Sequence, residues 1–185
     1  MLKLFDLQNK NVLLTGASKG MGLAMAQGLV NHGANVVISS RKLDQCQKAI
    51  ENINESIGQE KAFAFSCNAS SKDELNALVD FSISKLGSIT TLVCNAGVNS
   101  FFGSMSEIDD ESYDKTMDTN VKSNHWLINM VTPSMKESGG GSIMITSSIA
   151  AFHASETLGT YSISKLAVLG CLLYTSPSPR DSRKS

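Results

Sequence analysis

The stretch Thr15-Gly16-Ala17-Ser18-Lys19-Gly20-Met21-Gly22 lies directly between the apolar run Val12–Leu14 and a helix-like segment, Leu23–His32. A loop in this position faces helix N–H groups that have no internal partner, and the positive end of the helix dipole. Glycines let a phosphate approach that backbone closely, so the stretch predicts a dinucleotide site. An ordinary tight turn is the alternative, and the flanking strand and helix favour phosphate binding.

Composition limits the class of protein. The 185 residues suffice for one α/β domain, and a net charge of −1 without basic blocks argues against nucleic-acid binding. No apolar run approaches the ~20 residues of a membrane span, and no signal-peptide core precedes Asp6, so we expect a cytoplasmic protein without a membrane partner. Without a Cys-x-x-Cys pair, we expect reduced, buried thiols and no metal site at Cys46, Cys67, Cys94 and Cys171.

Short apolar runs alternate with helix-length segments along the chain. The runs are nearly continuous, as in parallel strands covered on both faces: Val12–Leu14, Val36–Ile38, Ala62–Phe65, Leu92–Cys94 and Ile143–Ile145. The predicted helices are Met21–His32, Leu43–Ile57, Lys72–Leu86, about Glu111 to Met135, and Tyr161 onward. Helix caps are predicted at Gly33, at Gly87 and in the capping box Ser71-x-x-Glu74. This order predicts an α/β fold, a Rossmann-type doubly wound parallel sheet, truncated after about five strands and the start of the sixth helix.

The residues after the second predicted strand indicate which dinucleotide binds. An NAD site usually has an acid here for the ribose 2′-hydroxyl, and this chain has none before Asp44. Arg41 and Lys42 supply positive charge instead, Lys19 adds more from the glycine loop, and a guanidinium suits a 2′-phosphate. We therefore expect NADP(H) as the preferred cofactor, with Ser40 and Arg41 beside the phosphate and NAD(H) as the second candidate. A solvated helix start is the alternative for these charges.

Tyr161 and Lys165 are four residues apart, so a helix places them on one face. A free tyrosine has a pKa near ~10, and a neighbouring cation lowers the pKa of a phenol toward the range useful for catalysis. Ser148, at the end of the fifth predicted strand, is able to hold a substrate carbonyl oxygen. These groups predict hydride transfer from a nicotinamide to a carbonyl carbon, with a proton from Tyr161. By itself, Tyr-x-x-x-Lys also arises by chance on amphipathic helices.

Three asparagines at the ends of strands or inside a helix are further candidate site residues. Asn68 follows the third strand, Asn95-Ala96-Gly97 follows the fourth, and Asn120 lies within the long helical segment. An ordinary turn explains Asn68 about as well as a binding role does. A generic turn is also the alternative for Asn95-Ala96-Gly97, but its position directly after the fourth strand argues against coincidence. Solvent exposure is the usual explanation for an Asn inside a helix.

Taken in order, these motifs resemble the short-chain dehydrogenase/reductase family from about Leu7 to Gly170. The resemblance implies that Asn120 interrupts its helix and relays protons through a water. Asn68 stands where the family often has an Asp beside the adenine, and this departure weakens that assignment only. The implied catalytic set is Asn120, Ser148, Tyr161 and Lys165. The implied cofactor contacts are Gly16, Ser18, Lys19, Gly20, Met21, Gly22, Ser40, Arg41, Asn68, Asn95, Ala96 and Gly97, with Tyr161 and Lys165 at the nicotinamide ribose.

By this resemblance, the full-length parent is a homo-oligomeric oxidoreductase that interconverts a small carbonyl compound and its alcohol. A non-catalytic dinucleotide-binding regulator on the same fold is the alternative, and the intact Ser148, Tyr161 and Lys165 favour the enzyme. Asn99–Phe102 and His153 are candidates for the mouth of the site, with packing or no chemical role as the alternative.

The composition changes after Gly170, and two of the three prolines are Pro177 and Pro179. We expect residues 1–170 to be an incomplete NAD(P)-binding domain and residues 171–185 to be a non-native tail. The peptide Cys171 to Asp181 resembles the translation of a transposase sequencing adaptor. Since the resembled family continues with further strands, we expect the 185-residue chain to be loosely folded or poorly soluble, and inactive. An uninterrupted genomic reading frame through Ser185 would contradict this expectation.

Overall fold

The computed structural model describes residues 5–153 and 155–175. The chain forms two compact units. Of the described residues, the first contains 5–96 and 126–146, and the second contains 97–125, 147–153 and 155–175. The boundary between the units falls inside a helix.

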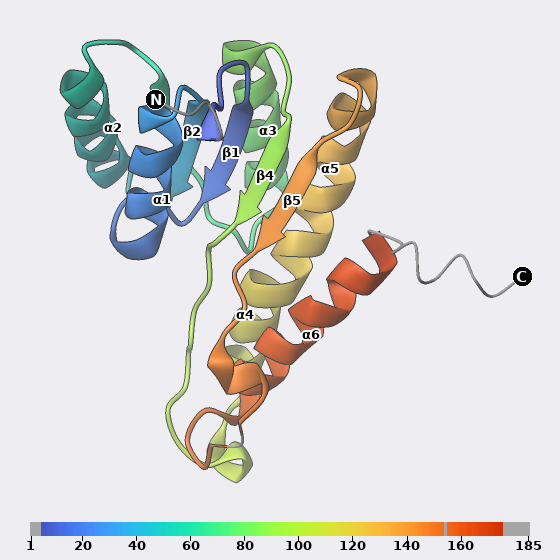
Figure 1. Cartoon of the computed structure of the whole chain (residues 1–185). Coiled ribbons are helices and arrows are strands. Elements are labelled where there is room, and N and C mark those ends of the chain that lie inside the picture. Colours follow the sequence, from blue (N-terminus) through green and yellow to red (C-terminus); the bar gives the residue numbers. More distant parts are fainter. Residues whose placement is uncertain (1–4, 154, 176–185) are drawn as a thin grey trace, which may run out of the picture. The chain divides into compact units, whose positions relative to one another are not determined.

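The first unit is built on a parallel sheet. Within the described residues it has five strands in the order β3-β2-β1-β4-β5 (Figure 1). The strands are β1 Asn11–Thr15, β2 Asn35–Ser40, β3 Ala62–Ser66, β4 Thr91–Cys94 and β5 Ser142–Ile145. Every predicted strand is confirmed to within two residues. The strand order reverses between β1 and β4, and ligands of doubly wound sheets bind beyond the carboxyl ends of the strands at such a point.

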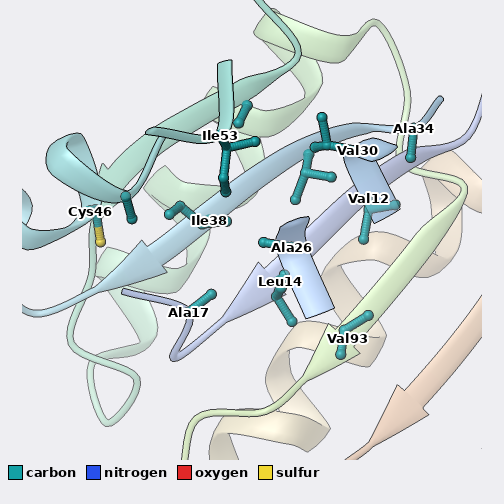
Figure 2. Close-up of a cluster of buried hydrophobic side chains, with 13 residues drawn as sticks. Val12, Leu14, Ala17, Ala26, Val30, Ala34, Ile38, Cys46, Ile53 and Val93 are labelled. Atoms are coloured by element: carbon teal, nitrogen blue, oxygen red, sulfur yellow. The ribbon is translucent and has the colours of Figure 1, made fainter. Parts of the chain in front are cut away.

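Helices cover both faces of this sheet, which confirms the doubly wound fold. The helices α1 (Gly20–Asn31) and α2 (Leu43–Ile57) lie on one face, and α3 (Lys72–Leu86) and α5 (Ser123–Glu137) lie on the other (Figure 1). Figure 2 shows the first core, in which Ala26, Val30 and Ile53 of the helices pack with Val12, Leu14 and Ile38 of the sheet. Leu13, between two members of that core, belongs to the opposite one. The strands are continuously apolar because both of their faces are buried.

The second unit contains shorter elements. They are the 3₁₀ turn η2 (Met105–Glu107), α4 (Asp110–Met117), the π-helical turn η3 (Asp118–Lys122), the start of α5, the 3₁₀ turn η4 (Ile149–Ala151) and α6 (Gly159–Thr175). The prediction of one helix from Glu111 to Met135 is therefore wrong in detail, because the π-helical turn separates α4 from α5. The hydrophobic pattern continues through this turn and does not reveal it.

The predicted helix caps are confirmed with one exception. Gly87 is the C-cap of α3 with φ +79°, and Gly33 follows α1 with φ +103°, a conformation that favours glycine. The Ser71 hydroxyl caps α3 by accepting from the Glu74 N–H at 3.3 Å. A capping box would return the Glu74 carboxylate to the Ser71 N–H, but it accepts from the Asn68 N–H at 2.8 Å instead. Half of the predicted box is wrong, because the turn before α3 offers a different donor.

The predicted burial of cysteines is confirmed for Cys46, Cys67 and Cys94 and is wrong for Cys171, which is half-buried near the end of α6. Burial raises the pKa of the Cys67 thiol to about 12. Among the described residues, no three His, Cys, Asp or Glu side chains lie together where a metal would bind. None of the described helices combines the length and hydropathy needed to cross a bilayer. In the predicted tail, residues 171–175 continue α6, while residues 176–185 lie outside the described residues.

Candidate active site

The glycine loop, in the first unit, follows a path that leaves no room for side chains at two of its glycines. Gly16 has φ +66°, and a Cβ built on it would lie 2.7 Å from the Cα of Ala96. A Cβ on Gly22 would strike the carbonyl oxygen of Gly16 and lie 2.7 Å from Nδ2 of Asn95. The predicted residues Gly16, Gly22, Asn95 and Ala96 therefore come together at the carboxyl end of β1 and β4.

Hydrogen bonds from the Asn-Ala-Gly segment hold the loop in place. Nδ2 of Asn95 donates to the carbonyl oxygens of Gly16 at 2.9 Å and of Thr15 at 3.2 Å. The Thr15 hydroxyl oxygen accepts from the N–H groups of Asn95 and Ala96, both at 3.1 Å. The Thr146 hydroxyl donates to Oδ1 of Asn95 at 3.2 Å and links the end of β5 to this network. The first two residues of the motif thus bind the turns that follow β1, β4 and β5 together.

Thr15, which opens the predicted loop, and Thr146 make hydrogen bonds in this network that sequence reasoning did not assign. Each ends an apolar strand with a hydroxyl, and Thr15 is buried. A threonine at the end of a buried strand was the available signal, since a buried hydroxyl needs a partner.

The start of α1 suits an anion. Its N-cap residue, Lys19, is extended and makes no side-chain cap bond, and the first turn holds no acidic residue. Lys19 and Met21 are exposed, Ser18 is half-buried, and Gly20 adopts φ +58° with no atom near its Cβ position. The predicted loop residues therefore lie around the helix N-terminus.

The residues after β2 and β3 serve local structure. The Ser40 hydroxyl accepts from the Lys42 N–H at 3.3 Å and lies 3.1 Å from Sγ of Cys46, so it supports the start of α2. Arg41 and Lys42 are exposed. Oδ1 of Asn68 accepts from the Ser70 hydroxyl at 3.0 Å and from the Ser70 N–H at 3.3 Å, which fits the turn alternative. An adenine contact by Asn68 stays a prediction.

The second unit contains all four predicted catalytic residues. Nζ of Lys165 lies 5.7 Å from the centre of the Tyr161 ring, within the range of a cation–π contact. Lys165 is only 5% exposed, and burial lowers the pKa of its amine below the ordinary lysine value. A Cβ on Gly97 would lie 3.2 Å from Nζ of Lys165 and 3.3 Å from Oδ1 of Asn120. The absence of a side chain at Gly97 is what lets these two groups approach the same point.

Asn120 lies at the centre of the π-helical turn and is 0% exposed. The prediction that it interrupts its helix is confirmed, and the alternative of a solvated surface residue is wrong. Its Oδ1 accepts from the Val98 N–H at 2.7 Å, and its Nδ2 donates to the Val98 carbonyl at 2.8 Å and to the Ser164 hydroxyl at 2.9 Å. The Asn120 carbonyl accepts from Nδ2 of Asn124 at 2.7 Å. Single π-helical turns inside α-helices occur frequently at functional sites.

Ser148 is the N-cap of η4, where its hydroxyl accepts from the Ala150 N–H at 3.2 Å. The preceding residue, Ser147, donates to the carbonyl of Lys165 at 2.8 Å and joins this loop to α6. Ser147 and Ser164 were also missed by sequence reasoning, because a small polar residue in a loop or helix gives no sign of its partner.

The candidate residues at the mouth of the site differ in exposure. Phe101 packs against Gly103, whose Cβ position lies 2.8 Å from the Phe101 ring, and this fits the packing alternative. Phe102 is 73% exposed, and His153 is exposed as well.

Residues 10–174 match the family model described as short chain dehydrogenase. The chain belongs to the short-chain dehydrogenase family. It is 39% identical over 165 residues to human dehydrogenase/reductase SDR family member 4, covering 89% of this chain and 58% of that protein. It is 35% identical to the pig protein of the same name over 180 residues, covering 96% and 63%. The chain thus spans less than two thirds of the length of these relatives.

Solved structures of short-chain dehydrogenases have the same fold. A short-chain type dehydrogenase/reductase from Mycobacterium marinum superposes with a TM-score of 0.87 at 30% identity, covering 94% of this chain and 68% of that one. A 7α-hydroxysteroid dehydrogenase, solved with NADH and 7-oxo glycochenodeoxycholic acid, gives 0.86 at 33% identity, covering 92% and 66%.

Two glycines of α1, one crowded and one not, test the tight packing of the glycine loop. Gly22→Ala is expected to lower the free energy of unfolding by about 1–3 kcal/mol, because its Cβ strikes the Gly16 carbonyl. Gly28→Ala, also in α1, meets nothing within 4 Å and is expected to raise it by roughly 0.5–1 kcal/mol. Urea unfolding compares the two variants, and equal stability would contradict the tight packing at Gly22.

Burial of Lys165 predicts a specific pH dependence. Its pKa in the folded chain lies below the usual 10.5, so between these two values the unfolded chain binds the proton more tightly. The free energy of unfolding is therefore expected to rise with pH in this window, relative to Lys165→Met. Urea unfolding at about pH 7 and about pH 10 measures the difference, with Tyr161→Phe in both chains to remove the phenol. Parallel pH curves would show that Lys165 is not desolvated.

Proposed function

We propose that the protein containing this chain is an NADP(H)-dependent oxidoreductase that interconverts a carbonyl compound and its alcohol by hydride transfer. The observation that carries the proposal is the buried Lys165 amine, which lies beside the Tyr161 ring and shares the space above Gly97 with Asn120. The names of the human relative and of the steroid dehydrogenase support the same class of reaction.

The described residues fit a dinucleotide. The glycine loop excludes side chains where the backbone packs most tightly, lies at the reversal of strand order and opens a helix without an acidic first turn. A bound nicotinamide supplies the hydride or accepts it. The pyrophosphate would be held by the glycine loop: Gly16, Ser18, Lys19, Gly20, Met21 and Gly22. Asn95 and Ala96 hold this loop in place through their hydrogen bonds to Thr15 and Gly16. Asn68 and Gly97 are proposed beside the adenine and the nicotinamide half, with Tyr161 and Lys165 at its ribose.

NADP(H) is proposed over NAD(H) because of the charges around the second strand. Lys19, Arg41 and Lys42 are all exposed cations, and no carboxylate precedes Asp44 after β2. Ser40 would act here mainly by holding the Lys42 N–H and with it the start of α2.

Tyr161 is proposed as the general acid in reduction and the base in oxidation. It passes its hydroxyl proton to the substrate oxygen, while the adjacent Lys165 charge stabilises the resulting phenolate. The low polarity around a buried amine strengthens that interaction. Ser148 donates a hydrogen bond to the same substrate oxygen. Asn120 is proposed to hold a water through which the proton is replaced.

Arg41→Ala in the full-length protein tests the cofactor preference. The change removes a charge-assisted contact to the 2′-phosphate, so the Kd for NADPH is expected to rise roughly 10- to 150-fold, the equivalent of 1.5–3 kcal/mol. The Kd for NADH is expected to stay the same. Fluorescence titration measures both dissociation constants. The matched control is Lys48→Ala, which removes an exposed positive charge within α2. Equal binding of NADH and NADPH before the change would show that the preference is wrong.

Tyr161→Phe in the full-length protein tests the chemistry. The variant keeps the ring beside Lys165 and loses the proton, so turnover is expected to fall by about 10²-fold or more. NADPH binding, measured by cofactor fluorescence, is expected to persist. Substantial turnover by the variant would remove Tyr161 from its proposed role. If the wild type binds NADPH but reduces no carbonyl compound, the regulator alternative is favoured.

A further inference from the structure

Ser164 lies between Tyr161 and Lys165 on α6 and is 0% exposed. Its hydroxyl donates to the backbone carbonyl oxygen of Tyr161 at 2.7 Å and accepts from Nδ2 of Asn120 at 2.9 Å. One buried hydroxyl therefore connects the helix that carries Tyr161 to the π-helical turn that carries Asn120.

The direction of these hydrogen bonds follows from the groups involved. A carbonyl oxygen only accepts, so the single proton of the Ser164 hydroxyl is committed to Tyr161. The hydroxyl must then accept from Asn120, which requires the Nδ2 side of the amide to face α6. Both Nδ2 protons are used, one on Ser164 and one on the Val98 carbonyl, while Oδ1 accepts from the Val98 N–H. The orientation of the amide is fully determined.

That orientation decides what surrounds Lys165. With Nδ2 held by Ser164, Oδ1 points to the side where the Cβ position of Gly97 lies 3.3 Å away, and the Lys165 amine lies 3.2 Å from the same position. A reversed amide would present its N–H groups there, beside a buried ammonium group. The hydroxyl of Ser164 thus keeps an acceptor oxygen rather than a donor on the side of Lys165.

We propose that Ser164 is a positioning residue of the active site, which acts through Asn120 by fixing the direction of its amide and the backbone of its π-helical turn. The inference rests on the proposed carbonyl reduction. Ser164 itself touches neither substrate nor cofactor in this role.

A matched pair on the same helix tests the proposal. Ser164→Ala removes the hydroxyl and leaves an Asn120 proton buried without its partner. Ser162→Ala removes another buried hydroxyl that, within the described part of the chain, has no hydrogen-bond partner. Turnover of the full-length protein and its variants is measured with NADPH and a panel of benzaldehyde, cyclohexanone and a steroid ketone. The expected result is that kcat falls about 10- to 100-fold in Ser164→Ala, with an unchanged KM for NADPH and a shifted pH profile of kcat. Ser162→Ala is expected to behave like the wild type.

The Asn120→Ala background distinguishes positioning from general loss of packing. If Ser164 acts through Asn120, adding Ser164→Ala to Asn120→Ala is expected to change kcat by less than about twofold. Ser164→Thr, which keeps the hydroxyl, is expected to recover most of the activity. Additive losses, or equal losses in Ser162→Ala and Ser164→Ala, would overturn the proposal while leaving the proposed function in place. A wild type that reduces none of the three compounds would overturn both.

Discussion

The glycine loop depends on one side-chain amide. Nδ2 of Asn95 donates to the Gly16 carbonyl, and it reaches that oxygen because Gly16 and Gly22 have no Cβ atoms to keep the segments apart. The Thr15 hydroxyl oxygen also joins the two segments, because it accepts hydrogen bonds from the backbone N–H groups of Asn95 and Ala96. Strand ends that are about 80 residues apart in sequence are therefore fixed within hydrogen-bonding distance of one another.

The second unit repeats this arrangement with a different asparagine. Asn120 is buried in the π-helical turn and uses its amide to bind both backbone groups of Val98. Satisfying the hydrogen bonds of a buried amide offsets the cost of removing it from water, and the partners then hold the turn in its irregular shape. Lys165, in the same unit, is buried, and the loss of water around its amine lowers the pKa of that amine. In such low-polarity surroundings its charge interacts more strongly with a nearby group.

The sequence alone predicted the features that depend on neighbouring residues along the chain, such as the strands. The strands were found because residues such as Val12, Leu13 and Leu14 are buried on alternating faces and all must be apolar. The motif order likewise predicted the loop and the four proposed catalytic residues. The interruption at Asn120 was predicted from the family resemblance and not from the hydrophobic pattern. The partners of Ser164 could not be predicted, because they depend on which groups lie around the Asn120 amide in three dimensions. The capping box failed for the same reason, since Glu74 had a competing donor at Asn68.

The crowding in the glycine loop divides its positions into two classes with different freedom to vary. Gly16 and Gly22 define the backbone path, and any other residue there requires neighbouring backbone to move. Lys19 and Met21 are exposed and make no such demand. Substitution at the exposed positions therefore changes the charge and shape of the loop surface without moving its backbone. A loop of this kind combines an invariant backbone path with an outer surface that tolerates replacement.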